Sequence, residues 1–408
     1  MSEQSIAQFR SRARSWLEAS VPRKTGDDAG GELGVVDIAA QKAFQASLCD
    51  AGFAGITWPR EYGGQGLTNA EQIAFSEEAR NFTLPVGAFT IGLGMPGPTI
   101  LELGSEAQKK RYLPKLLRGE EIWCQLFSEP SSGSDVASLT TTAVSDGDGW
   151  LLNGQKVWTS GAQYSDFGAV IARTDPTVPK HDGITMFILD MHSPGVTVRP
   201  LKVATGAAPF NEVFLDQVRL PADSVIGEVD KGWSAAVVML RNERVTIGTS
   251  TAPRTSPLAY DSLSELATRL GRGADAGLGR ELAELYARGR AVRLFGQLLR
   301  EEAMAGRDPG PRGSVAKLAG AELGQFAAGV ASHVLGTGVA GFDSADKQVA
   351  AVVAYVVGAP GGSIAGGTNE IQRNIIGERV LGLPKDPGVD RNTPFNQLRV
   401  GTQHREKN

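Results

Sequence analysis

The chain has 408 residues, a formal net charge of −4 and two cysteines. This length predicts two or three packed units instead of one simple core. The acidic balance, without a block of like charges, argues against a nucleic-acid groove or a membrane-surface patch. No apolar run reaches the roughly 18 residues that a membrane helix needs. The four histidines lack metal-ligand spacing, so we expect no metal site. The few cysteines and the absence of a signal-like start predict a cytoplasmic protein.

Three sequence textures follow one another along the chain. Up to residue 121, apolar residues such as Phe9, Ala13 and Trp16 recur at helical spacing. Residues 122–229 consist of short β-branched and aromatic segments broken by Gly, Asp and Pro, which predicts a compact antiparallel barrel or sandwich. Residues 230–384 are again rich in helix formers, with a glycine-rich turn at 358–367 before the last helix. The polar tail 385–408 is expected to be mobile or to contact another subunit.

The order of these textures predicts an α+β protein. We expect an N-terminal helical domain at 1–121, a middle β-domain at 122–229, a C-terminal helical domain at 230–384 and the tail at 385–408. Segments 92–97 and 336–341 both match G-x-G-x-x-G. That pattern binds dinucleotides only between a strand and a helix, whereas the first segment lies in a helical region and the second links two helices. We therefore interpret both as helix-end or close-packing glycines.

Three motifs combine aromatic residues, hydroxyls and glycines. Segment 123–135 reads Trp-Cys-Gln-Leu-Phe-Ser-Glu-Pro-Ser-Ser-Gly-Ser-Asp and passes from an apolar stretch into a turn rich in hydroxyls and free backbone N–H groups. Such a segment suits a large, flat ligand that carries phosphates. Segment 158–160 is Trp-Thr-Ser, and segment 366–374 is Gly-Gly-Thr-Asn-Glu-Ile-Gln-Arg-Asn.

In this order, the motifs resemble those of the flavin-dependent acyl-CoA dehydrogenases, from about residue 9 to about residue 384. Segments 58–64, 153–156, 211–214 and 225–228 fit the same pattern. The resemblance implies an N-terminal all-α domain, a middle antiparallel β-barrel and a C-terminal four-helix bundle. It also implies FAD, an acyl-CoA substrate and an electron-transfer flavoprotein as electron acceptor. Further implications are a role in fatty acid metabolism and lipid catabolism, and a homotetramer or hetero-oligomer arranged as a dimer of dimers.

Acyl-CoA dehydrogenation needs a base for the α-proton and an acceptor for the β-hydride, and no side chain can be that acceptor. By resemblance, Ser160 would donate to flavin N5, Trp158 would flank the flavin ring, and Ser134 would contact phosphate or the pantetheine arm. The residues that the resemblance assigns to the cofactor are Gln125, Leu126, Phe127, Ser128, Ser134, Trp158, Thr159, Ser160, Gly367, Thr368 and Glu370. Glu370 lies at the start of a helix, so it serves either capping or flavin contacts.

The catalytic base is predicted at an unusual position. Many relatives carry a glutamate just before the final Gly-Thr, where this chain has Gly366. Others carry it on the first long helix of the C-terminal domain, where Glu243 and then Arg244 fall. The apolar neighbours of Glu243 would raise its pKa. The alternative is a salt bridge of Glu243 and Arg244 with other helices. The resemblance implies that a backbone N–H at this position polarises the thioester carbonyl, and a glycine still supplies that N–H. The residues that the resemblance assigns to the substrate are Gly366, Arg244 and Ser134.

A second departure concerns the partner subunit. Relatives carry Arg-Phe-Gly some distance after the Glu243 position, and this chain lacks the Phe-Gly there, so Arg254, Arg269 or Arg272 would have to replace that flavin contact. Two alternatives to an active dehydrogenase therefore stay open. One is a catalytically silent or flavin-sharing subunit of a hetero-oligomeric acyl-CoA dehydrogenase. The other is a flavoprotein oxidase or monooxygenase of the same fold.

Overall fold

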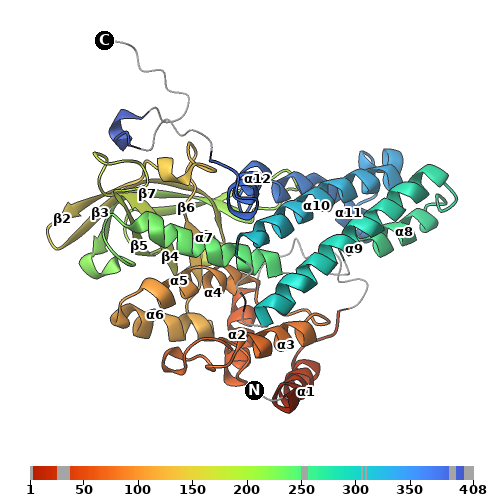
Figure 1. Ribbon diagram of the computed structural model, residues 1–408, viewed down its shortest axis with the longest axis horizontal. Coiled ribbons are helices and arrows are strands. Elements are labelled where there is room, and N and C mark those ends of the chain that lie inside the picture. The colour runs from red at the N-terminus through yellow and green to blue at the C-terminus, as the bar shows by residue number, and fades with distance from the viewer. Residues whose placement is uncertain are drawn as a thin grey trace, which may run out of the picture. The chain divides into compact units, whose positions relative to one another are not determined.

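The structure is a computed structural model that describes residues 3–24, 37–249, 256–304, 307, 310–385 and 392–398. Its contacts group the chain into two compact units (Figure 1). The sheet unit comprises residues 37–67, 85–243 and 386–408, and the helical unit comprises residues 1–36, 68–84 and 244–385. The units interleave along the chain, and the predicted domain boundaries, which follow sequence order, stay predictions.

The sheet unit is built on seven described strands. Their order is β1-β4-β2-β3-β7-β6, and β5 pairs with β4. β2–β3, β3–β7, β6–β7 and β4–β5 are antiparallel, whereas β1–β4 is parallel. β2 also pairs with β4 in parallel, through Thr142 and Arg173. The predicted β-domain is confirmed, with these parallel pairs as an addition. The strands are β1 (Trp123–Leu126), β2 (Thr142–Asp146), β3 (Gly149–Ser160), β4 (Phe167–Arg173), β5 (Ile184–Asp190), β6 (Val196–Leu201) and β7 (Phe210–Pro221).

The core of the sheet unit explains the sequence texture of its strands. β4 and β5 are buried along almost their whole length, so their residues form continuous apolar runs. β7 alternates between buried and more exposed residues over its first half, as expected for a strand with one covered face. Buried residues such as Val170, Phe187 and Val213 form one apolar cluster across the sheet.

Helices complete the sheet unit. They are α2 (Ile38–Asp50), α4 (Thr90–Gly94), α5 (Pro96–Leu103), α6 (Glu106–Arg118) and the first part of α7 (Gly232–Thr249). Segment 92–97 spans α4 and α5, as interpreted from the sequence. A Cβ on Gly92 would lie 2.8 Å from the Leu116 side chain, and one on Gly97 would lie 2.6 Å from Trp58. These glycines therefore permit close packing and do not form a nucleotide-binding turn.

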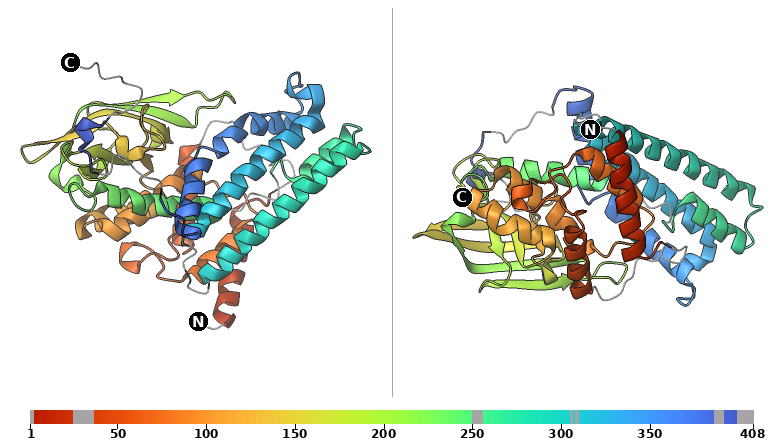
Figure 2. Two further views of the ribbon diagram at one scale, coloured as in Figure 1. Left: turned by 45° about the horizontal axis from the view of Figure 1, so that its top comes forward. Right: turned by 90° about the horizontal axis from the view of Figure 1, so that it is seen from below.

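The helical unit holds α1 (Glu3–Ser20), α3 (Asn69–Ala79), α8 (Tyr260–Arg269), α9 (Ala276–Met304), α10 (Gly313–Leu335), α11 (Lys347–Gly362), α12 (Asn369–Ile375) and a π-helix, Ile376–Val380. α9, α10 and α11 run alongside one another (Figure 2). Leu263 of α8, Leu285 of α9, Ala331 of α10 and Val352 of α11 lie in one buried cluster. The predicted C-terminal helical domain is thus confirmed, with a core drawn from four helices.

Two predicted segments differ in detail from the structure. α11 continues through Pro360 to Gly362, so the glycine-rich turn before α12 is shorter than predicted. The φ of proline is fixed near a helical value, so Pro360 continues the backbone of α11 at the loss of one hydrogen bond. Within the tail, Phe395–Gln397 forms one turn of 3-10 helix, and residues 386–391 and 399–408 lie outside the described residues.

Candidate active site

β3 carries a bulge at the Trp-Thr-Ser motif. Between Lys156 and Thr159, β3 has one residue more than the facing part of β7. Trp158 lies in this bulge with a φ of 60°, a left-handed conformation that costs a bulky residue roughly 1–2 kcal/mol. The bulge interrupts the strand alternation, so that Lys156 is fully buried while Trp158, two residues later, is 57% exposed. The indole touches the Phe210 ring edge-on and otherwise offers an aromatic face at the surface.

The two hydroxyl residues after Trp158 differ in their surroundings. Thr159 is 1% exposed, and its hydroxyl is buried without a hydrogen-bond partner among the described residues. Asn211 donates from Nδ2 to the Thr159 carbonyl at 3.0 Å. Ser160 ends β3 and is half-buried. Trp158 and Ser160 are thus accessible to a ligand, whereas the Thr159 side chain points into the protein.

The structure brings the predicted segment 125–128 next to this part of β3. Gln125 and Ser128 are half-buried, and Leu126 and Phe127 are buried. The Val157 N–H donates to the Ser128 carbonyl at 2.9 Å, immediately before the bulge. The two sequence motifs, 125–128 and 158–160, therefore form one continuous wall.

A buried ion pair lies beneath this wall. The Lys156 ammonium is 2.8 Å from Glu129 Oε1 and donates to the Phe127 carbonyl at 3.2 Å. The same carboxylate accepts from the Thr140 N–H at 2.7 Å and from the Thr141 N–H at 3.0 Å. Burial opposes ionisation of Glu129, but attraction to Lys156 and these hydrogen bonds outweigh it and lower its pKa to about 2. The pair fixes both ends of the loop 129–141.

Sequence reasoning assigned no functional role to Lys156 or Glu129, although a signal for the pair was present. Lys156 lies four positions after the buried Leu152 on β3, and residues an even number apart point to the same face of a strand. A lysine on the inward face needs a buried anion.

The predicted Ser134 lies in the exposed middle of the anchored loop. Its neighbour Asp135 forms an ion pair with Lys180 at 2.8 Å and accepts from the Ser138 hydroxyl at 2.6 Å. Burial opposes ionisation of Asp135, and the hydrogen bonds from Lys180 and Ser138 outweigh it and lower its pKa. Ser134 is thus an exposed hydroxyl on a loop that is held from several sides.

The glycine motif belongs to the helical unit. Gly366 and Gly367 have φ values of 67° and 87°, which side chains rarely tolerate. Gln372, only 1% exposed, donates from Nε2 to the Gly366 carbonyl at 2.9 Å and to the Gly367 carbonyl at 3.3 Å. The Thr368 hydroxyl caps α12 by accepting from the Ile371 N–H at 3.3 Å. Gln372, to which the sequence assigned no role, therefore holds the turn of this motif.

Glu370 lies in the first turn of α12 and is exposed. Hydrogen bonds from its own backbone N–H and from Thr368 lower its pKa, in agreement with helix capping. The Lys317 ammonium of α10 is buried without a partner among the described residues, and burial lowers its pKa against the attraction of Glu370.

The predicted base lies on α7. Glu243 and Arg244 are within this helix, but their side chains lie outside the described residues, so their roles stay predictions. Of the three candidate arginines, Arg254 lies outside the described residues entirely. Arg269 forms an ion pair with an aspartate at 2.7 Å and Arg272 forms one at 2.9 Å, in both cases within their own unit.

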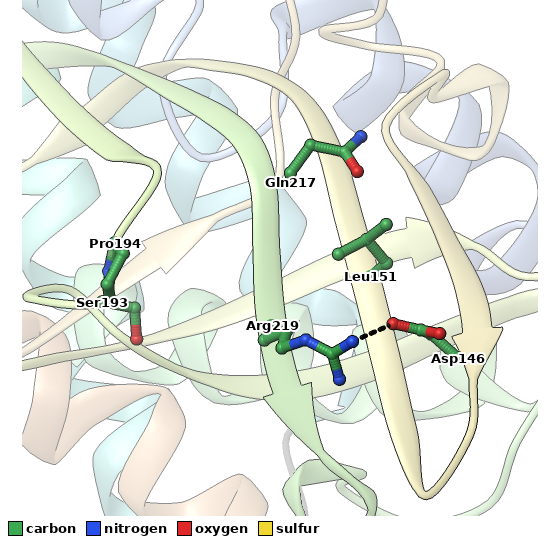
Figure 3. A pocket seen from close by; sticks show the side chains of 6 residues that line it. All are labelled: Asp146, Leu151, Ser193, Pro194, Gln217 and Arg219. Carbon is green, nitrogen blue, oxygen red and sulfur yellow. Dashed lines mark hydrogen bonds and ion pairs between the residues drawn. The ribbon is translucent and has the colours of Figure 1, made fainter.

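A surface pocket lies elsewhere on the sheet (Figure 3). It is lined by Asp146, Leu151, Ser193, Pro194, Gln217 and Arg219, and none of the predicted site residues lines it. Arg219 and Asp146 form an ion pair at its edge at 2.5 Å. Across the described ranges, no group of three or more His, Cys, Asp or Glu residues could hold a metal ion. Nor does any described helix combine the length and apolarity that a membrane crossing requires.

Three family descriptions match consecutive parts of the chain. Residues 3–120 match "Acyl-CoA dehydrogenase, N-terminal domain", residues 124–218 match the middle domain, and residues 230–381 match the C-terminal domain. The chain belongs to the acyl-CoA dehydrogenase family. The resemblance drawn from the motifs is therefore confirmed, together with the three-domain architecture. Acyl-CoA dehydrogenases are flavoprotein oxidoreductases of lipid and fatty acid catabolism.

Two mycobacterial relatives show how far the similarity extends. The chain is 39% identical over 390 residues to acyl-CoA dehydrogenase FadE34 of Mycobacterium tuberculosis, a match that covers 92% of this chain and 52% of FadE34. It thus spans about half the length of FadE34. Acyl-CoA dehydrogenase IpdE1 of the same organism is 36% identical over 396 residues, covering 94% of this chain and 99% of IpdE1.

Solved acyl-CoA dehydrogenase structures share the fold. The structure named Tcur3481-Tcur3483 steroid ACAD has a TM-score of 0.77 at 27% identity, over 95% of this chain and 99% of that chain. The ChsE4-ChsE5 complex from Mycobacterium tuberculosis has a TM-score of 0.72 at 28% identity, over 94% of this chain and 99% of that chain.

Proposed function

We propose that this chain is an FAD-dependent acyl-CoA dehydrogenase that forms a 2,3-enoyl-CoA from a saturated acyl-CoA. The observation that carries the proposal is Trp158, an indole held exposed in a strained conformation by a bulge. Natural proteins keep such strain mainly at functional positions. An exposed aromatic face beside the half-buried Ser160 suits a planar flavin ring. FAD, when bound, would accept the hydride from the β-carbon at N5.

The residues around Trp158 would orient the cofactor. We assign Gln125, Leu126, Phe127 and Ser128 to the edge of the flavin. Thr159, whose side chain is buried, would contribute only backbone contacts. Gly367, Thr368 and Glu370 of the helical unit would contact the diphosphate, where Gly367 permits close approach of the backbone. The hydroxyl of Ser160 would donate to negative charge that develops at N5.

Glu243 is our candidate for the base that removes the α-proton. The preceding part of α7 carries buried apolar residues such as Ala236 and Met239, and an apolar environment raises the pKa of a carboxyl group toward the working range. The Gly366 N–H would stabilise the enolate oxygen that forms as the proton leaves. Ser134 and Arg244 would bind the substrate, and an electron-transfer flavoprotein would take up the electrons.

The test compares Glu243→Gln with Glu102→Gln. Glu102 is an exposed residue of α5 and forms an ion pair at 2.6 Å with Arg241, which lies on α7 like Glu243. The Glu102→Gln variant therefore controls for a lost surface charge near α7. Both variants are purified with bound flavin and mixed anaerobically with a panel of acyl-CoAs. We expect loss of flavin bleaching in Glu243→Gln alone. Bleaching at the wild-type rate in that variant would show that Glu243 is not the base.

A flavin-sharing, catalytically silent subunit is the second candidate. It is favoured by Gly366, which has no side chain to titrate, and by the names of structural neighbours that pair two proteins, such as the ChsE4-ChsE5 complex. We infer an oligomer, either of this chain alone or with a second chain. A purified chain that is colourless alone and yellow only with a co-expressed partner would support the silent subunit.

The substrate class that we propose is a branched or bulky acyl group. Gly366 leaves free the space that a glutamate side chain fills in many relatives, and one structural neighbour is named a steroid ACAD. Straight-chain, branched and polycyclic acyl-CoAs should be compared with an artificial electron acceptor. A preference for straight chains would contradict this proposal without affecting the assignment of the reaction.

A further inference from the structure

Part of the C-terminal tail is docked on the sheet unit. The Phe395 N–H donates to the Val178 carbonyl at 2.8 Å, and the Asn396 N–H donates to the Pro176 carbonyl at 2.9 Å. Both acceptors belong to the loop 174–183, which connects β4 to β5. Because two backbone hydrogen bonds and a turn of 3-10 helix fix the segment 392–398, it has a defined position on this loop.

The Phe395 ring covers a buried cation. The guanidinium of Arg173, the last residue of β4, lies 4.0 Å from the ring centroid, and Arg173 is 2% exposed. Burial lowers the pKa of Arg173 to about 10. An aromatic face stabilises a cation most where water is excluded, so the ring fits the electrostatic need of this site.

Arg173 joins two segments that are far apart in sequence. Its Nη1 donates to the Lys180 carbonyl at 2.9 Å and to the Asp182 carbonyl at 2.8 Å. Its Nη2 donates to the Ala137 carbonyl at 2.7 Å. Ala137 belongs to the loop 129–141, so one side chain ties this loop to the turn at 180–182.

The Lys180 side chain closes a second connection to the same loop. Its ammonium lies 2.8 Å from Asp135, the residue after Ser134. The exposed turn at Ser134 is thus held by Glu129 at its start, and by Lys180 and Arg173 on the far side. Phe395 covers Arg173, which makes the hydrogen bond to the Ala137 carbonyl.

We propose that the tail segment 392–398 is a positioning segment for the part of the site that binds coenzyme A. Phe395 keeps Arg173 shielded from water, and Arg173 keeps the Lys180 turn and the Ser134 loop in place. The proposal rests on the proposed role of Ser134 in substrate binding. Because no tail residue is assigned to the reacting atoms, loss of the segment should weaken substrate binding and leave the chemical step intact.

Three full-length point variants, purified with flavin, test this segment. Phe395→Ala removes the ring, Phe395→Tyr keeps it, and Gln397→Ala changes an exposed residue of the same 3-10 helix. Hydrogen exchange at 130–138 and 174–183, the Kd of free coenzyme A by calorimetry, and the KM and kcat with an acyl-CoA are measured. We expect Phe395→Ala to raise Kd and KM roughly 5- to 30-fold, with kcat within about twofold.

Phe395→Ala should also speed exchange in both loops, while Phe395→Tyr and Gln397→Ala match the wild type. A chain that ends at Lys385 provides a second variant with the same expectation as Phe395→Ala. Faster exchange with an unchanged Kd for coenzyme A would overturn the positioning role. Unchanged exchange and unchanged Kd in Phe395→Ala would overturn the docking itself. A wild-type protein that binds no coenzyme A would instead overturn the proposed function, and the exchange data would still decide whether the tail is docked.

Discussion

The buried pair of Lys156 and Glu129 leads to a quantitative prediction for Lys156→Met. Methionine keeps most of the apolar stem but removes the charge, and Glu129 is then left 4% exposed without its cation. The pair and its hydrogen bonds lower the pKa of Glu129 from 4.5 to about 2, which corresponds to roughly 3 kcal/mol. This agrees with the roughly 3–5 kcal/mol lost when one partner of a buried pair is removed.

The assay is thermal unfolding at pH 7, followed by circular dichroism. For a unit of this size, a loss of about 3 kcal/mol lowers the unfolding midpoint by roughly 6–12 °C. Lys42→Met is the matched control, because Lys42 is partly exposed and 3.4 Å from Asp166, and such pairs contribute at most about 1 kcal/mol. The double variant Lys156→Met/Glu129→Gln leaves no unpaired charge and should recover most of the loss. Equal midpoints for Lys156→Met and Lys42→Met would refute the reasoning.

Three further predictions concern acid stability, the exposed indole and the glycine turn. Because the pKa of Glu129 is depressed, its stabilisation is complete above about pH 4.5 and lost as the pH falls toward about 2. The midpoint of the wild type should therefore fall relative to that of the uncharged double variant over this range, and a constant difference would contradict the prediction. Trp158→Gly removes the indole and the left-handed strain together, so the unfolding midpoint should stay within about 4 °C of the wild type. Flavin retention on a desalting column should fall. A large loss of stability would identify Trp158 as structural. Gln372→Glu replaces a donor with an acceptor opposite the Gly366 and Gly367 carbonyls. We expect kcat to fall about 10-fold or more with little change in KM. A wild-type kcat in this variant would exclude a positioning role for Gln372.

Much of the fold could be predicted because its signals are local. The helical spacing of Phe9, Ala13 and Trp16 became α1, and the short β-branched and aromatic segments of residues 122–229 became the seven described strands. Gly92 and Gly97 proved to be packing positions, as their flanking sequence indicated. These features depend on residues within one or two turns or strand positions of each other, so periodicity is sufficient to detect them.

The motifs also predict which residues form the candidate site, but they do not predict its geometry. The motifs identify the family, which implies a flavin, and they predict Trp158, Ser160 and the Gly366 turn as site residues. That Trp158 faces outward depends on a bulge between β3 and β7, whose paired residues lie more than about fifty positions apart. Strand alternation alone would have placed it on the same side as the buried Lys156.

The sequence by itself thus determined the family, the order of helices and strands, and the residue types available for flavin and acyl-CoA chemistry. Only the tertiary structure decided which of these residues are accessible, how Glu129 and Lys156 anchor the wall, and that Phe395 covers Arg173 from about 220 residues away. The physical reason is that buried charges and strained backbone are stabilised by partners from distant parts of the chain, and those partners meet only after the sheet has formed.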